Sequence, residues 1–122
     1  MSFEKDGKRY YQNPVIFADF SDPDPIVFGD YYYMTASSFQ YTPGLPILRS
    51  GNLADWELIG YALDKIPEKR FDLPQVSHGV WAPSMRVYDA YVWIFYGMPD
   101  EGIYAVKAER PEGPWSRPCL IK

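Results

Sequence analysis

Residues 20–25 read Phe-Ser-Asp-Pro-Asp-Pro, and a strand-like run, Gly-Asp-Tyr-Tyr-Tyr-Met-Thr-Ala, follows at residues 29–36. Further along, Trp-Ala-Pro-Ser at residues 81–84 precedes a second such run, Tyr-Val-Trp-Ile-Phe-Tyr, at residues 91–96. The chain therefore carries one structural unit twice. Self-similarity at a fixed spacing is typical of architectures that are built from stacked copies.

The two copies can be compared position by position. Equivalent positions hold the same or similar residues: Pro23 and Pro83, Val27 and Val87, Phe28 and Tyr88, Tyr31 and Tyr91, and Trp56 and Trp115. Each copy reads as strand, tight turn, aromatic strand, loop, short strand, polar turn and tryptophan, with no long helical period. This pattern predicts an all-β fold in which each copy forms one blade of a β-propeller. Two hairpin units of another antiparallel sandwich are the alternative.

Composition narrows the class of protein. The chain has 9 glycines and 12 prolines among its 122 residues. Their combined share is above the roughly 12% that these two residues make up in average proteins. The net charge of −4 argues against nucleic acid or an anionic membrane as a partner. The first eight residues contain no apolar stretch typical of a signal peptide, and the single cysteine, Cys119, suits a reducing compartment. These features predict a cytoplasmic, loop-rich β protein.

The inventory of reactive side chains excludes several kinds of site. His78 and Cys119 are too few for a zinc site, and no glycine-rich phosphate loop is present, so neither a metal nor a cofactor is predicted. What remains is carboxylates among aromatic residues, which make up 18% of the chain. Aromatic rings can lie against the apolar face of a sugar, and a carboxylate can activate water against an anomeric carbon. This combination would suit glycoside hydrolysis, although most of the aromatic residues are expected to pack within the blades.

Residues 13–25 and 29–39 together resemble the start of glycoside hydrolase family 43, which contains β-xylosidases and α-L-arabinofuranosidases. Further similar motifs follow in the same order, at residues 43–47, 50–56, 79–84, 100–104 and 113–116. The resemblance covers nearly the whole chain from Asn13 onward. It implies a five-bladed β-propeller, of which residues 1–122 cover about the first two blades, blade 1 at about 14–60 and blade 2 at about 78–118.

The resemblance also implies the chemistry. Family members invert the anomeric configuration with two carboxylates spaced roughly 6.5–9.5 Å apart, at the propeller axis where each innermost strand begins. The general base maps onto Asp22, whose alternative role is a turn acid at the blade entry. Asp24 would share a face with Asp22 if the segment is extended, either as a substrate-binding neighbour or as a rival for the base in a shifted register. Asp19 is interpreted as structural.

Three more residues are candidates for binding a sugar. The resemblance implies that Phe39 forms a wall of the binding subsite and that Trp81 lines the same pocket, although each could simply plug the core. His78, in the loop before the second blade, is interpreted either as a substrate contact or as an ordinary polar residue.

Arg86 is either solvated or paired with an acid. Ala90 replaces the glycine expected in a turn that needs a positive φ, which puts the geometry of that turn in doubt.

The end of the chain departs most from the family. The resemblance implies a second aspartate that tunes a pKa and a glutamate that acts as general acid, both in later blades, and neither Glu101 nor Glu109 occupies the position of that acid. We therefore expect residues 1–122 to be inactive alone and to need the remaining blades or a second chain. Alternatives are a non-catalytic sugar-binding fragment, or another five-bladed sugar enzyme such as a mannoside phosphorylase or a fructosidase. Residues 21–24 do not match the Asn-Asp-Pro-Asn motif of a fructosidase.

Overall fold

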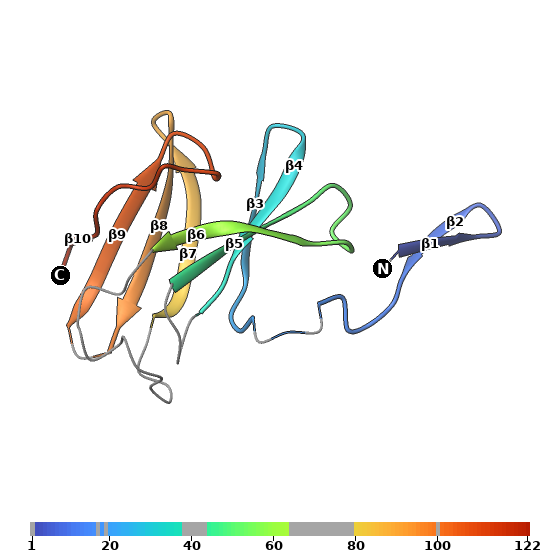
Figure 1. The fold of residues 1–122 in the computed structure, drawn as a ribbon, viewed down its shortest axis with the longest axis horizontal. Helices are drawn as coiled ribbons and strands as arrows, with labels where there is room; N and C mark the ends of the chain where they lie inside the picture. The colour runs from blue at the N-terminus through green and yellow to red at the C-terminus, as the bar shows by residue number, and fades with distance from the viewer. Residues whose placement is uncertain (1, 17, 19, 38–43, 64–79, 100) are drawn as a thin grey trace.

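The computed structural model describes residues 2–16, 18, 20–37, 44–63, 80–99 and 101–122. Within these ranges every regular secondary-structure element is a β-strand. The strands form two four-stranded antiparallel sheets and one separate hairpin (Figure 1). The all-β expectation is therefore confirmed for the described residues, while the number of blades in a complete propeller stays a prediction.

The first sheet holds the first copy of the repeat. Its strands, in spatial order, are β3 (Asp24–Phe28), β4 (Tyr31–Thr35), β5 (Gly44–Ser50) and β6 (Glu57–Leu63). Chain neighbours are also sheet neighbours, so the sheet is a simple antiparallel meander. Gly29 joins β3 to β4 with φ of +59°, a conformation that glycine adopts without steric cost.

The second sheet repeats this plan. Its strands are β7 (Trp81–Tyr88), β8 (Tyr91–Met98), β9 (Gly102–Ala108) and the short β10 (Cys119–Leu120), in the same spatial order. The pairing of β7 with β8 is interrupted by a bulge between Trp81 and Ser84. The repeat that the sequence indicates is therefore a repeat of sheets.

The turn between β7 and β8 keeps the expected geometry without its glycine. Asp89 and Ala90 have φ of +51° and +66°, which is the left-handed pair of a type I′ turn. A left-handed conformation costs a residue with a Cβ atom about 1–2 kcal/mol. The substitution of glycine by Ala90 thus leaves the hairpin intact and adds local strain.

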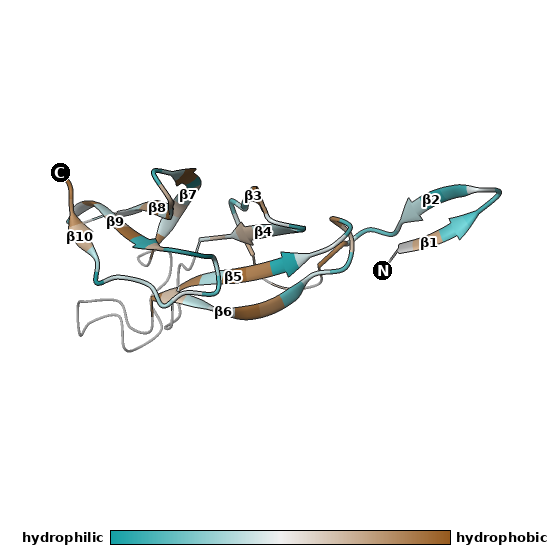
Figure 2. Ribbon diagram, turned by 90° about the horizontal axis from the view of Figure 1, so that it is seen from above, coloured by the Kyte–Doolittle hydropathy of each residue, from teal (hydrophilic) through white to brown (hydrophobic). Residues whose placement is uncertain are grey.

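The main core lies between the two sheets. Alternate residues of β8, namely Val92, Ile94 and Tyr96, are buried against the first sheet, which contributes Leu45 and Ile47 from β5. Figure 2 shows apolar residues recurring along β5 and β6. The first strands of the two sheets, β3 and β7, contact each other, and a hydrogen bond joins the start of β7 to the end of the first sheet where β3 begins. This packing places the two blade entries side by side.

An N-terminal hairpin, which the sequence analysis did not predict, lies apart from both sheets (Figure 1). It consists of β1 (Ser2–Lys5) and β2 (Lys8–Tyr11), joined by Asp6 and Gly7 with φ of +53° and +72°. The rings of Phe3 and Tyr10 stack across the two strands with centroids 5.5 Å apart. The contact stabilises a hairpin whose described side chains are exposed.

Candidate active site

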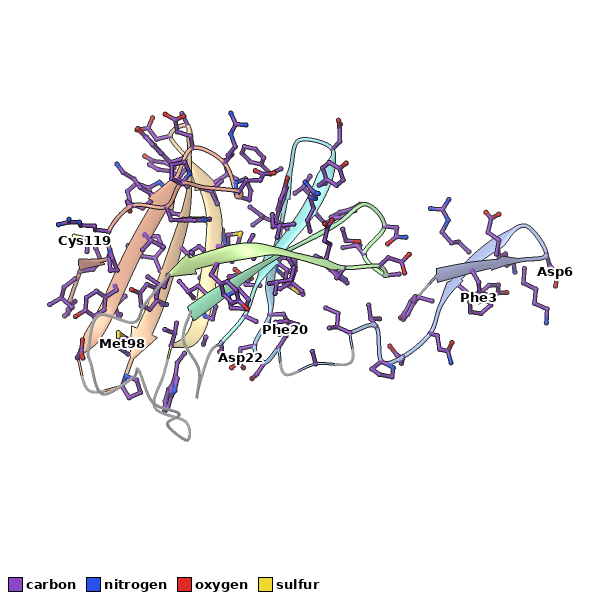
Figure 3. The ribbon with its side chains drawn as sticks, in the orientation of Figure 1. Phe3, Asp6, Phe20, Asp22, Met98 and Cys119 are labelled. Atoms are coloured by element: carbon purple, nitrogen blue, oxygen red, sulfur yellow. The ribbon has the colours of Figure 1, made fainter. Side chains whose placement is uncertain are left out.

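Asp22 lies two residues before β3, at the end of the first sheet where that strand begins. In Figure 3 it lies toward the same end of the two sheets as Met98, the last residue of β8. Asp22 is exposed, and its Oδ2 accepts hydrogen bonds from the hydroxyls of Ser37, at 2.8 Å, and Ser21, at 3.1 Å. The carboxylate is therefore held from one side by two hydroxyls while it remains accessible to solvent.

Ser37 joins the two blade entries. Its backbone N–H donates to the carbonyl of Ser21 at 2.8 Å, and its Oγ accepts from the backbone N–H of Ala82 at 2.8 Å. Trp81, the residue before Ala82, is 41% exposed and lies at the same end of the molecule. The structure thus brings Asp22 and Trp81 to one end of the sheets, as expected of a shared site. The contact of Trp81 with a sugar stays a prediction.

Asp22 and Ala82 are equivalent positions of the repeat, because each precedes the matched proline. Both have a left-handed backbone, with φ of +50° and +38°. The same strained entry is therefore built twice, and only the first copy carries a carboxylate. Backbone conformations of this kind cluster at functional sites, where the surrounding structure holds them in place.

Asp24, the first residue of β3, makes different contacts. Its Oδ2 accepts the backbone N–H of Met85 at 2.7 Å and a guanidinium N–H of Arg86 at 2.6 Å. Asp24 therefore bonds β3 to β7 across the interface between the sheets, and Arg86 is paired with an acid. The expectation that Asp22 and Asp24 share a face is wrong in its premise, because the positive φ of Asp22 breaks the extended alternation. Binding of a sugar by Asp24 stays a prediction.

Phe39, His78 and Asp19 lie outside the described residues. Glu101 is partly buried in the turn between β8 and β9, and its Oε2 accepts the Tyr104 hydroxyl at 2.8 Å. Because β8 ends where β7 begins, Glu101 lies toward the same end of its sheet as Trp81.

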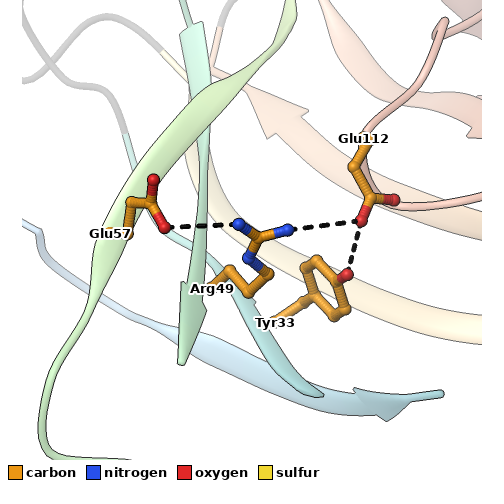
Figure 4. A network of polar contacts seen from close by, with 4 residues as sticks. All are labelled: Tyr33, Arg49, Glu57 and Glu112. Atoms are coloured by element: carbon orange, nitrogen blue, oxygen red, sulfur yellow. Dashed lines mark hydrogen bonds and ion pairs between the residues drawn. The ribbon is translucent and has the colours of Figure 1, made fainter. Parts of the chain in front are cut away.

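A second polar network ties the sheets together (Figure 4). The hydroxyl of Tyr33 on β4 donates to Glu112 at 2.5 Å, and Glu112 also lies 4.0 Å from the guanidinium of Arg49. Arg49 bonds Glu57 on β6 at 3.3 Å. Burial, and then the bond to Glu112, raises the pKa of the Tyr33 phenol above 10.0. The network connects the first sheet to the loop before β10 and so helps to fix the relative position of the two blades.

Among the described residues, no group of three or more His, Cys, Asp or Glu side chains is placed to hold a metal ion. In the same part of the chain, no helix is long and apolar enough to cross a membrane.

Sequence reasoning missed the role of Ser37. The residue stands within the motif that continues to Phe39, and Ser37-Ser38 directly after an aromatic strand was a visible signal. A pair of hydroxyls at a strand end indicates polar contacts, but the partners of Ser37 come from two other segments of the chain. Only the packing of the sheets shows which partners these are.

Comparisons with known proteins show the family of the chain. The model of the family "Glycosyl hydrolases family 43" matches residues 11–122. The non-reducing end alpha-L-arabinofuranosidase BoGH43B of Bacteroides ovatus is 34% identical over 120 residues, covering 93% of this chain and 22% of the relative. A xylosidase/arabinosidase of Butyrivibrio fibrisolvens is 36% identical over 111 residues, covering 89% of this chain and 21% of the relative.

Solved structures show the same likeness in three dimensions. The GH43 BlXynB protein from Bacillus licheniformis has a TM-score of 0.77 at 32% identity, with 88% of this chain and 24% of that chain covered. The Bacteroides ovatus GH43B structure has a TM-score of 0.71 at 33% identity, with 88% and 22% covered. The chain spans about a fifth to a quarter of the length of these relatives. The chain belongs to glycosyl hydrolase family 43.

Proposed function

We propose that this chain supplies the general base of a glycosidase that removes terminal xylose or arabinose residues from hemicellulose-derived oligosaccharides. The observation that carries the proposal is the environment of Asp22. Its carboxylate is exposed, is held by two serine hydroxyls, and lies at the same end of the sheets as the exposed Trp81. An oriented carboxylate beside an aromatic surface is suited to activating water against a sugar.

The proposed reaction is a single displacement with inversion. Asp22 accepts a proton from a water molecule as the water oxygen attacks the anomeric carbon and the bond to the leaving oxygen breaks. The leaving oxygen receives its proton from a general acid, which we place in a part of the enzyme outside residues 1–122. The hydroxyls of Ser21 and Ser37 hold the carboxylate of Asp22 in place for this role.

We further propose that the propeller is completed by other blades or by a second chain, and that residues 1–122 alone do not turn over substrate. General acid catalysis typically contributes about 10²–10⁴-fold, so its absence would leave negligible activity. The incomplete coverage of the relatives supports this proposal.

The test compares residues 1–122 with the full product of the gene on an aryl β-xyloside and an aryl α-L-arabinofuranoside. We expect turnover from an assembled propeller and none from residues 1–122. Asp22→Asn should lower kcat at least about 100-fold without weakening sugar binding, because the amide is nearly isosteric but accepts no proton. Asp30→Asn is the matched control, since Asp30 is an exposed aspartate at the opposite end of β3 and should change nothing.

Two results would contradict the proposal. An Asp22→Asn variant that keeps more than about a hundredth of the wild-type rate would exclude Asp22 as the base. Sugar binding by the assembled protein without hydrolysis of either substrate would instead support the non-catalytic alternative. Turnover by residues 1–122 alone would require an acid within this chain, and Glu101 would be tested first.

A further inference from the structure

We propose that Ser37 is the positioning residue for the catalytic base, and that it holds Asp22 through a hydrogen-bond relay that begins in the neighbouring sheet. The inference rests on the proposed function of Asp22. The relay runs from the backbone N–H of Ala82 to the Oγ of Ser37, and from the Ser37 hydroxyl to Oδ2 of Asp22, with both bonds 2.8 Å long.

The direction of the relay follows from the chemistry of its members. A backbone N–H can only donate, so the Ser37 oxygen must accept from Ala82. The single hydroxyl proton of Ser37 is then free to point to Asp22, whose ionised carboxylate can only accept. Because successive bonds of one direction polarise each other, the amide of Ala82 strengthens the bond that Asp22 receives.

The relay orients one particular oxygen of Asp22. Ser37 and Ser21 both donate to Oδ2. Among the described residues no donor to Oδ1 is found, so Oδ1 is the oxygen left to accept a proton from water. A carboxylate held by one oxygen and open at the other has the arrangement that a positioned general base requires.

Ser37 is itself firmly held. It is 5% exposed, and its backbone N–H is bonded to Ser21. Both ends of its relay, Asp22 and Ala82, have the left-handed backbone, which is strained and persists only when several contacts enforce it. Ser37 supplies such a contact to both. The orientation of the base therefore depends on the correct packing of β7 against β3.

The test uses the full product of the gene. We expect Ser37→Ala to lower kcat about 10–100-fold with KM nearly unchanged, the usual size of one lost bond to a charged group. Ser37→Thr keeps the hydroxyl and should restore most of the rate. Ser50→Ala is the matched control, because Ser50 is equally buried and its Oγ accepts backbone N–H groups of its own turn, without contact to Asp22. It should lower stability and leave kcat unchanged.

A second readout needs no activity. Scalar couplings between Hα and Hβ of Asp22 should report one χ1 rotamer in the wild type and in Ser37→Thr, and averaging in Ser37→Ala. The Ala82 amide proton should move upfield in Ser37→Ala because it loses its acceptor. A single rotamer that persists in Ser37→Ala overturns the inference, even in an inactive protein.

The two proposals fail separately. If Asp22→Asn remains active, the proposed base is wrong. If Asp22→Asn is inactive while Ser37→Ala keeps its kcat, only the positioning role is wrong. In the Asp22→Asn background, Ser37→Ala should cause no further loss of rate, because it acts through Asp22 alone.

Discussion

Replacing Asp24 with alanine removes the carboxylate oxygen that accepts both the Met85 N–H and the Arg86 guanidinium. Met85 is fully buried, so its N–H would lose its partner out of reach of water, at a cost of about 1–3 kcal/mol. The pair with Arg86 adds at most about 1 kcal/mol, because the Arg86 side chain is 62% exposed. We therefore expect Asp24→Ala to lower the free energy of unfolding by about 1–4 kcal/mol.

Urea unfolding of the full gene product, followed by tryptophan fluorescence, measures this loss as a lower midpoint at constant slope. Asp24→Asn keeps an oxygen for Met85 and should lose less. Asp22→Asn is the opposite control, because Asp22 is exposed and asparagine tolerates a positive φ, so its stability should change by no more than about 0.5 kcal/mol.

The two acids should therefore separate, with Asp24 affecting stability and Asp22 affecting the rate. An Asp24→Ala variant of wild-type stability that has lost its activity would refute this reasoning. It would indicate that Asp24 acts on the substrate, as the shifted-register alternative holds.

Three further predictions concern a hairpin turn, a hydrogen bond between the two sheets and a buried phenol. Ala90→Gly should raise the free energy of unfolding by about 0.5–1 kcal/mol in urea titrations, because relief of the left-handed strain exceeds the added entropy of glycine in the unfolded chain. A free energy of unfolding below that of the wild type would contradict the turn geometry. A double-mutant cycle of Tyr33→Phe and Glu112→Gln should give a coupling of about 1–2 kcal/mol, and additive effects would show that their bond contributes nothing. Burial raises the pKa of the Tyr96 phenol above 10.0. Above pH 10 the phenol therefore stays protonated in the native state while it ionises in the unfolded chain. The free energy of unfolding should then fall by up to about 1.4 kcal/mol per pH unit. Tyr96→Phe should remove that part of the alkaline slope, and an unchanged slope would assign it to other groups.

The strands could be predicted because their signals are local. Short aromatic and β-branched runs bounded by Gly, Asp and Pro indicate strands and turns directly, and the repeat indicates that both runs belong to equivalent sheets. The N-terminal hairpin carried one comparable signal, Asp6-Gly7, the pattern of a type I′ turn. Its flanking residues do not alternate between apolar and polar and lie outside both copies of the repeat, so the sequence did not indicate strands there.

The contacts of the acids could not be predicted, because each depends on a backbone detail or on a distant partner. An extended chain would have placed Asp22 and Asp24 on one face. The left-handed Asp22 instead directs its carboxylate to Ser37, while Asp24 bonds β7, which lies about half the chain length away in sequence. Periodicity describes faces of regular strands, so it fails at the residue where the strand has not yet begun.

The repeat itself indicates where the chemistry lies once the sheets are known to be equivalent. Asp22 and Ala82 occupy the same strained position, and Asp24 and Ser84 follow it at the same interval. The backbone conformation is the same in both copies, so we interpret it as structural. The acidic side chain occurs in the first copy alone, which indicates an additional role there. Ser37 bonds to both members of this pair, to the side chain of one and to the backbone of the other. The carboxylate of Asp22 is therefore the feature that the equivalent position of the second blade lacks, and catalysis is the role that we propose for it.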